Sequence, residues 1–203
     1  MGYSHYWYQA ESYDPILWEK VITDFNTILD LEDFRRLLDR NPESGQRLQI
    51  TEDVIWFNGK PPEDHETFSL YGKMSGYELA RAKKLNETCD NMVEVRVVDG
   101  VETRTPIEPD PIKKSDHPYF GSCKTSYKPY DLVVMCCLII AKSHLGNSFD
   151  ARSDGDVVEW QQAREICEKH LGIKSLIKNG DLYVEGYVSV TEEGIFNFSS
   201  NIP

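Results

Sequence analysis

The segment PYDLVVMCCLIIAKSHLG, residues 129 to 146, decides the fold. It contains ten consecutive apolar residues, Leu132 to Ala141. A helix that is apolar on every side is normally buried on every side. Pro129 suits the start of such a helix and Gly146 its end. Because a membrane span needs about 20 apolar residues, the run predicts a buried core helix at about 129–145.

The remaining pattern predicts strands and helices that pack around this helix. Asp14-Pro15 favours a helix start, with Asp14 as N-cap, and apolar residues then recur at helical spacing up to Asn41-Pro42, either without interruption or across a kink. Short apolar runs indicate strands at 3–9, 54–57, 66–71 and 120–126, and further strands follow a helix that ends at 170–172. The sequence therefore predicts an α+β fold with a mixed sheet, an N-terminal helix pair and the buried helix.

The length of 203 residues favours a single domain over 1–203. Within it, residues 73–118 are charged and contain several prolines, and Met92 to Val98 is their one plausible strand. We expect 73–118 to be a loop-rich excursion from the main domain, with 105–118 as a loop.

Charge and cysteine content exclude several classes of function. The chain has 34 acidic and 22 basic residues, a net charge of −12. Such a surface repels phosphate backbones and anionic lipids, so we expect neither nucleic-acid binding nor a membrane contact. Five cysteines, two of them adjacent, do not suit a disulfide framework and favour a reducing compartment. The first residues lack the features of a secretory signal. These observations predict an acidic cytoplasmic protein.

Polar residues gather just ahead of the buried helix. Cys123, Lys124 and Thr125 lie on the predicted strand 120–126, and Tyr130 and Asp131 open the helix. Strand alternation places Cys123 and Thr125 on one face and Lys124 on the other, so Lys124 does not activate its neighbour. Cys123 is then either a nucleophile or a half-buried structural cysteine.

A second polar segment, His65 to Leu70, is expected to meet the first. Alternation predicts that Glu66 shares the core face of Phe68, where its carboxylate needs a partner, and Lys124 is one across the sheet. Such a pair is either structural or the floor of a pocket. His65 is expected at the surface, with a role as base for Cys123 as the alternative.

These residues define the predicted pocket, where the end of strand 120–126 meets Glu66 and Asn58. Glu66 is the candidate acid or base, Lys124 the group that binds an anion, and Cys123 the candidate nucleophile. The ligand-binding candidates are Asn58, Thr125, Tyr130 and Asp131. We favour Lys124 with Glu66 over a thiol mechanism.

No motif identifies a cofactor or a metal. Asp150 to Asp156 is acidic but lacks the ligand pattern of a calcium loop, so a turn at Asp154-Gly155 is the simpler interpretation and an unusual cation site the alternative. The pattern His-Leu-Gly occurs at 144–146 and 170–172, either as a duplicated unit or as two similar helix ends. The cofactor stays unknown and no metal site is expected.

Several segments resemble a family of uncharacterised proteins from bacteria and their phages. The opening Met-Gly-Tyr-Ser-His-Tyr-Trp at 1–7 is similar to the Met-Gly-Tyr-Thr-His-Tyr-Trp of that family. Other matching segments are Ile55-Trp-Phe-Asn-Gly59, Glu66-Thr-Phe68, Cys123-Lys-Thr125, Lys128-Pro-Tyr-Asp131, Leu138-Ile-Ile-Ala-Lys142 and Ser153-Asp-Gly155. The resemblance implies a shared fold outside 73–118 and names no activity.

Two functions remain open. The first is a small-ligand-binding protein or enzyme whose pocket takes a small anionic ligand. The second is a noncatalytic interaction or assembly protein of phage or host origin, which would use an acidic, aromatic-rich surface.

Overall fold

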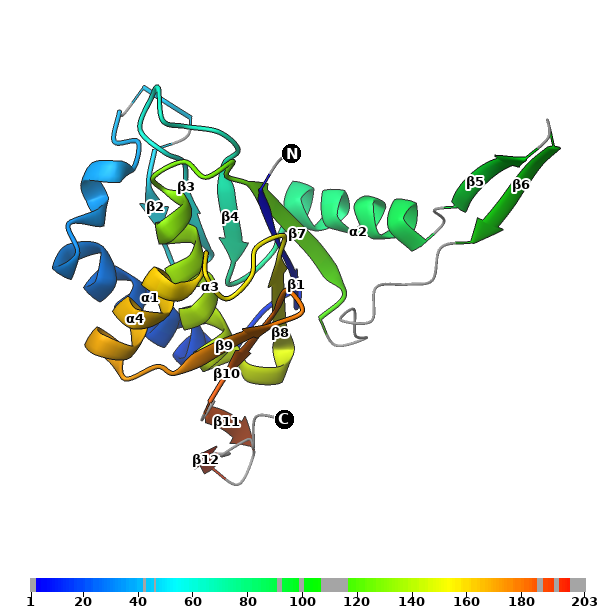
Figure 1. The fold of residues 1–203 in the computed structure, drawn as a ribbon. Helices are drawn as coiled ribbons and strands as arrows, with labels where there is room; N and C mark the ends of the chain where they lie inside the picture. Colours follow the sequence, from blue (N-terminus) through cyan, green and yellow to red (C-terminus); the bar gives the residue numbers. More distant parts are fainter. Residues whose placement is uncertain are drawn as a thin grey trace.

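A five-stranded sheet forms the centre of the molecule in the computed structural model (Figure 1). The structure describes residues 3–41, 43–45, 47–90, 93–98, 101–106, 117–185, 188–191 and 194–197. The strand order is β7-β1-β8-β10-β9, with β1 Ser4–Gln9, β7 Tyr119–Lys124, β8 Phe149–Ser153, β9 Ser175–Lys178 and β10 Asp181–Val184. A three-stranded sheet, β2-β3-β4, lies beside it, with β2 Gln49–Ile50, β3 Val54–Phe57 and β4 Phe68–Tyr71.

The α+β class is confirmed, whereas the strand pairing differs from the expected mixed sheet. Every strand pair among the described residues is antiparallel. The chain leaves β7, passes through helix α3 (Asp131–Leu145) and returns as β8, a connection that normally makes parallel neighbours. Here β1 lies between β7 and β8 and runs opposite to both. β1 therefore separates β7 and β8, which would otherwise be parallel neighbours, and the sheet is antiparallel.

Helix α3 is the buried helix that the sequence predicts. From Val133 to Ala141 each of its side chains is at most 4% exposed. It lies between the sheet and two further helices, α1 (Pro15–Leu31) and α4 (Gln161–Leu171) (Figure 1). Gly146 ends α3 with a φ of 57°, and Gly172 ends α4 with a φ of 69°. The two His-Leu-Gly segments thus share the chemistry of a helix end.

The N-terminal helix pair consists of α1 and one 3-10 turn. The Asp14 carboxylate accepts hydrogen bonds from the N–H groups of Ile16 (2.8 Å) and Leu17 (3.3 Å), as an N-cap does. Asp33 then adopts a left-handed conformation with a φ of 52°, which turns the chain into the 3-10 helix η1 (Phe34–Leu37). A second 3-10 turn, η2 (Gly146–Ser148), follows α3.

Residues 73–118 contain a helix that the sequence analysis did not predict, α2 (Gly76–Asp90). Asn86 joins it to β7, since its amide donates to Pro118 O (2.6 Å) and accepts from Phe120 N–H (3.3 Å). The predicted strand at 92–98 is β5 (Val93–Val98), which pairs with β6 (Val101–Pro106) and extends beyond the two sheets (Figure 1). Most of the predicted loop 105–118 lies outside the described residues.

The last described strands form a hairpin of β11 (Val188–Thr191) and β12 (Gly194–Asn197).

Over the described part of the chain, no helix combines the length and the apolar character that a membrane span requires.

Candidate functional site

The structure brings three of the predicted site residues, Cys123, Lys124 and Tyr130, together around a fourth, Glu66. Tyr130 OH donates to Glu66 O (2.6 Å), and the Cys123 thiol lies 3.4 Å from the same carbonyl oxygen. The backbone N–H of Lys124 donates to Glu66 Oε2 (2.8 Å), and Glu66 N–H donates to Lys124 O (3.3 Å). We call these contacts the Glu66 clamp. They attach the chain ahead of β4 to the end of β7.

The side chain of Glu66 does not point into the core as predicted. It is exposed, because β4 begins only at Phe68 and the alternation of the strand does not extend back to residue 66. Its carboxylate meets the backbone of Lys124, and the described residues contain no ion pair between that carboxylate and the Lys124 ammonium. The pair therefore acts as a link between backbone segments. His65 is exposed, as expected.

Cys123 has the environment of a structural thiol. Its side chain is fully buried on the core face of β7, while Lys124 lies on the other face, as alternation predicts. Burial is the main cause that raises the pKa of Cys123 to about 12. A nucleophilic cysteine requires a lowered pKa and access for its substrate. The geometry thus favours the structural alternative for Cys123.

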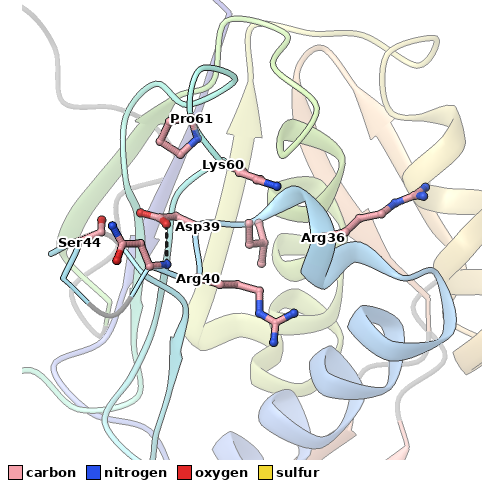
Figure 2. A pocket seen from close by; sticks show the side chains of 8 residues that line it. Arg36, Asp39, Arg40, Ser44, Lys60 and Pro61 are labelled. Atoms are coloured by element: carbon pink, nitrogen blue, oxygen red, sulfur yellow. Dashed lines mark hydrogen bonds between the residues drawn. The ribbon is translucent and has the colours of Figure 1, made fainter.

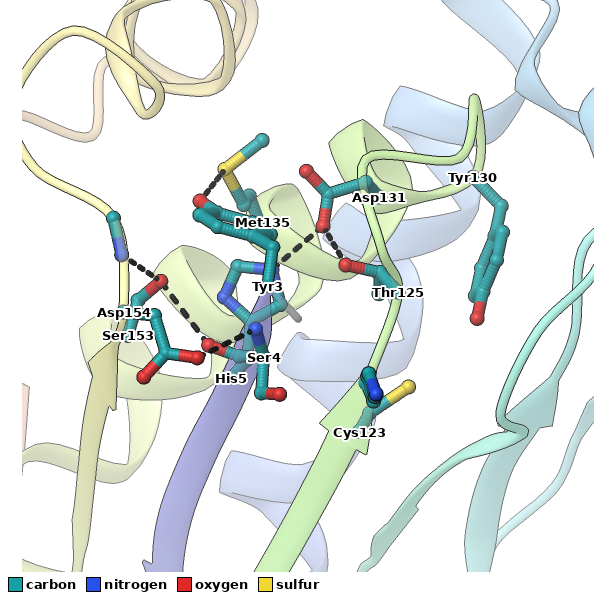
Figure 3. A network of polar contacts seen from close by, with 12 residues as sticks. Tyr3, Ser4, His5, Cys123, Thr125, Tyr130, Asp131, Met135, Ser153 and Asp154 are labelled. Carbon is teal, nitrogen blue, oxygen red and sulfur yellow. Dashed lines mark hydrogen bonds and ion pairs between the residues drawn. The ribbon is translucent and has the colours of Figure 1, made fainter. Parts of the chain in front are cut away.

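Thr125 and Asp131 belong to a second cluster, the His5 network (Figure 3). Asp131 Oδ1 accepts a hydrogen bond from Thr125 Oγ1 (2.5 Å) and lies 2.7 Å from His5 Nε2. His5 and Thr125 are fully buried, and Asp131 is 7% exposed at the start of α3. The ring of Tyr3 lies edge-on to His5 and stacks on Tyr127. The network joins β1, the residue that follows β7 and the start of α3, next to the stacked rings of Tyr3 and Tyr127.

Sequence reasoning missed His5, although a signal was present. Tyr3, His5, Trp7 and Gln9 share one face of β1 by alternation, and all four are buried. A histidine on a core face requires a polar partner, because unpaired buried polar groups are costly. Asp131 is the carboxylate that meets it, so the pattern of alternation in β1 could have paired these two residues in advance.

Asn58 organises the loop that leads to Glu66. It is fully buried, and its amide oxygen accepts from the N–H groups of Gly59 (2.7 Å) and His65 (3.3 Å), while its amide nitrogen donates to His65 O (2.9 Å). Gly59 packs so closely on Tyr130 that an added Cβ would lie 2.6 Å from the ring. Asn58 therefore fixes the loop 58–66 from inside.

A hollow of about 530 Å³ opens at the other end of this loop (Figure 2). Three basic side chains line it, those of Arg36 in η1, Arg40 just after η1, and Lys60 in the loop. We call it the basic hollow. Lys60 N–H donates to Leu37 O (2.8 Å), and Asp39 N–H donates to Asn58 O (3.0 Å). These backbone bonds fix the loop against the chain that follows η1.

The charges of the basic hollow are largely free of protein partners. Arg36 makes one exposed contact of 3.6 Å with Asp33, and neither Arg40 nor Lys60 forms an ion pair within the described part of the chain. Asp39, the acid of the hollow, accepts hydrogen bonds from Ser44 and from the N–H of Asn41, which lower its pKa. The Asp39 carboxylate is therefore engaged with the neighbouring residues Asn41 and Ser44. The three basic side chains face solvent.

A second, smaller hollow lies where α2, β4 and the outer edge of β7 meet. Neither hollow is lined by Glu66, Cys123 or Lys124. Within the described residues, no group of three or more His, Cys, Asp and Glu side chains is arranged to hold a metal ion. Of the predicted site residues, Glu66, Cys123, Lys124 and Tyr130 therefore converge, and they join one end of the loop 58–66 to the end of β7, whereas the basic hollow lies at the other end of the loop.

No protein-family model matches the sequence, and the searches of curated proteins and of solved structures gave no significant match.

Proposed function

We propose that this chain is a cytosolic protein that binds a small anionic ligand in the basic hollow. The support is a local excess of positive charge. The chain has a net charge of −12, yet the basic hollow is lined by three basic side chains and one acid. Cations in a concave surface concentrate anions, because their fields add and the walls reduce screening by solvent.

The size of the hollow and its chemistry define the ligand class. A volume of about 530 Å³ is in the range of sites for metabolite-sized molecules. Guanidinium groups bind carboxylates and phosphates through paired hydrogen bonds, and an ammonium group adds a point charge. Arg36, Arg40 and Lys60 together suit a ligand with two or more negative charges.

The rigidity of the loop 58–66 supports the proposal. Asn58 holds it from inside, the Glu66 clamp holds its end, and Lys128 Nζ contacts Glu63 Oε2 at 3.0 Å. A site whose backbone is already fixed loses less entropy when a ligand binds. The residues that the sequence singled out thus contribute by positioning Lys60.

Binding of inorganic pyrophosphate, measured by isothermal titration calorimetry, tests the proposal. Replacement of Lys60 or Arg40 by Ala is expected to weaken pyrophosphate binding about tenfold or more, the usual effect of losing a charge-assisted hydrogen bond. Binding should also weaken as the salt concentration rises, because the cations are exposed.

Arg35→Ala is the matched control. Arg35 precedes Arg36 in the chain, and its replacement removes the same charge, but its guanidinium contacts Asp30 and donates to Asn26 Oδ1 (2.7 Å). It should leave pyrophosphate binding nearly unchanged. Equal weakening by all three variants would show a general charge effect and contradict a specific site.

We also propose membership of the bacterial and phage family that begins Met-Gly-Tyr-Thr-His-Tyr-Trp. The support is the set of matching segments from 1–7 to 153–155. The proposed anion site would then be looked for in other members at the positions of Arg36, Arg40 and Lys60.

A further inference from the structure

The smaller hollow beside α2, which we call the α2 hollow, presents hydrogen-bonding groups without protein partners. It has a volume of about 200 Å³, and its aromatic walls are Trp56, Tyr71, Tyr77 and Phe120. That volume has room for a single ring with its substituents. The site is separate from the basic hollow and does not depend on the function proposed for it.

Gln9 directs an amide group at the α2 hollow. Its side chain is 2% exposed, and its Oε1 accepts a hydrogen bond from Tyr71 N–H (3.1 Å). This bond fixes the orientation of the amide, because the oxygen must face the donor. Among the residues that the structure describes, the amide nitrogen has no acceptor, and Gln9 lines the hollow. A buried amide with a free donor at a hollow is a feature of a binding site.

The outer edge of β7 adds a backbone hydrogen-bond donor and a backbone acceptor. Phe120 N–H bonds to Asn86, and both the N–H and the C=O of Lys124 bond to Glu66, so these residues direct their backbone away from β1. Outward-facing groups recur at every second residue of an antiparallel strand. The N–H and C=O of Ser122 therefore also face outward, toward the hollow that Ser122 lines.

The flanking contacts limit what can occupy this edge. An added peptide strand would need several consecutive outward-facing residues. Here Asn86 and Glu66 already occupy the positions on both sides of Ser122, and the described residues provide no partner for Ser122 itself. One residue with one donor and one acceptor matches a single amide group and excludes an added strand.

The free amide donor of Gln9 favours a ligand that offers a carbonyl oxygen beyond the one that meets Ser122. Trp56 also lines the hollow, and its indole N–H, which is buried and has no acceptor in the described part of the chain, can report on binding. Aromatic walls favour a flat ring, since aromatic rings stack on one another.

We propose that the α2 hollow binds a small planar ring that carries an amide edge, with a ring N–H next to a C=O, as in a pyrimidinone. The backbone of Ser122 pairs with the amide edge. The Gln9 amide nitrogen donates to a second carbonyl oxygen, and Tyr77 covers the ring from α2.

A titration of the ¹⁵N-labelled protein with uracil, followed by NMR, tests this assignment. We expect saturable shifts of the Ser122 amide signal and of the Trp56 indole signal, which the Trp56→Phe variant identifies. 1,3-Dimethyluracil retains the ring and both carbonyl groups but has no N–H, and it should bind about tenfold more weakly.

Two variants and a control complete the test. Ser122→Pro removes the backbone donor at an edge strand, where proline is tolerated, and Tyr77→Ala removes the cover. Each should weaken uracil binding about tenfold, while Tyr127→Ala, which removes another exposed tyrosine, should not. The proposal would be overturned if uracil gave no saturable shift, or if 1,3-dimethyluracil or toluene bound as tightly as uracil. It would also be overturned if glucose bound and uracil did not.

Discussion

Polar residues gather at both ends of the loop 58–66, and the two ends differ in how these polar groups are satisfied. At one end, the Glu66 clamp joins backbone and side-chain groups of Cys123, Lys124 and Tyr130 to Glu66. At the other end, Arg40 and Lys60 have no ionic partner within the described residues. Convergence of polar residues therefore does not by itself mark a ligand site. The end with unsatisfied charge at a hollow is the better candidate.

The largest expected effect concerns the reactivity of Cys123. Because burial raises the pKa of Cys123 to about 12, its thiolate population at neutral pH is far smaller than that of a free cysteine. Native protein treated with iodoacetamide should therefore show very slow alkylation at Cys123, read by peptide mass spectrometry. The same peptide in urea is the control. Fast alkylation in the native state would show that the Cys123 thiol is accessible and ionised. It would restore the hypothesis that Cys123 is a nucleophile.

The second effect concerns the His5 network beside the clamp. Asp131→Ala leaves His5 and Thr125 without their shared acceptor in a buried site. We expect a loss of about 3 kcal/mol in the free energy of unfolding, typical when one member of a buried polar pair is removed. Urea denaturation measures it, with Asp53→Ala as comparison, because the Asp53 carboxylate is exposed and makes no contact within the described residues. A loss below about 1 kcal/mol would mean that the closed end is not held by this network.

A smaller effect is expected from the clamp hydroxyl. Tyr130→Phe removes the hydrogen bond to Glu66 O and should reduce the free energy of unfolding by about 1 kcal/mol. Differential scanning calorimetry of both proteins would detect it. If the variant instead matches the parent in stability, the clamp does not fasten the loop. A large loss of pyrophosphate affinity without loss of stability would make Tyr130 a ligand contact.

The smallest effect is a pH dependence at the end of α1. The hydrogen bond from His170 is the main cause that lowers the pKa of Glu32 from its ordinary value of 4.5. Because the folded-state pKa lies below the unfolded one, this contribution is present above 4.5 and is lost as the pH falls through the folded-state value.

Glu32→Gln should therefore lose less stability than the parent on acidification, by under about 1 kcal/mol for a pair near the surface. Chemical denaturation at a series of acidic pH values measures the difference. Parallel pH profiles for the two proteins would contradict this assignment.

Local patterns predicted much of the fold. The apolar run predicted α3, Asp14 capped α1 as expected, and alternation correctly placed Cys123 and Lys124 on opposite faces of β7. These features depend on short stretches of chain. The antiparallel pairing was missed, because no local signal shows that β1 lies between β7 and β8.

The candidate site was less predictable for a related reason. Glu66, Cys123 and Tyr130 do meet, but a sequence does not show whether meeting groups satisfy each other or leave a hollow. Arg36, Arg40 and Lys60 carry no motif, and they share a hollow only because backbone bonds join the loop 58–66 to the chain after η1.

The most direct test compares the two ends of the loop with one ligand. Pyrophosphate affinity is measured by calorimetry for Arg40→Ala, at the open end, and for Lys124→Ala, at the closed end. Each variant removes one positive charge, so the general field changes equally. We expect a loss of about tenfold or more for Arg40→Ala and almost none for Lys124→Ala. The opposite order would place the anion site at the Glu66 clamp and exclude the basic hollow.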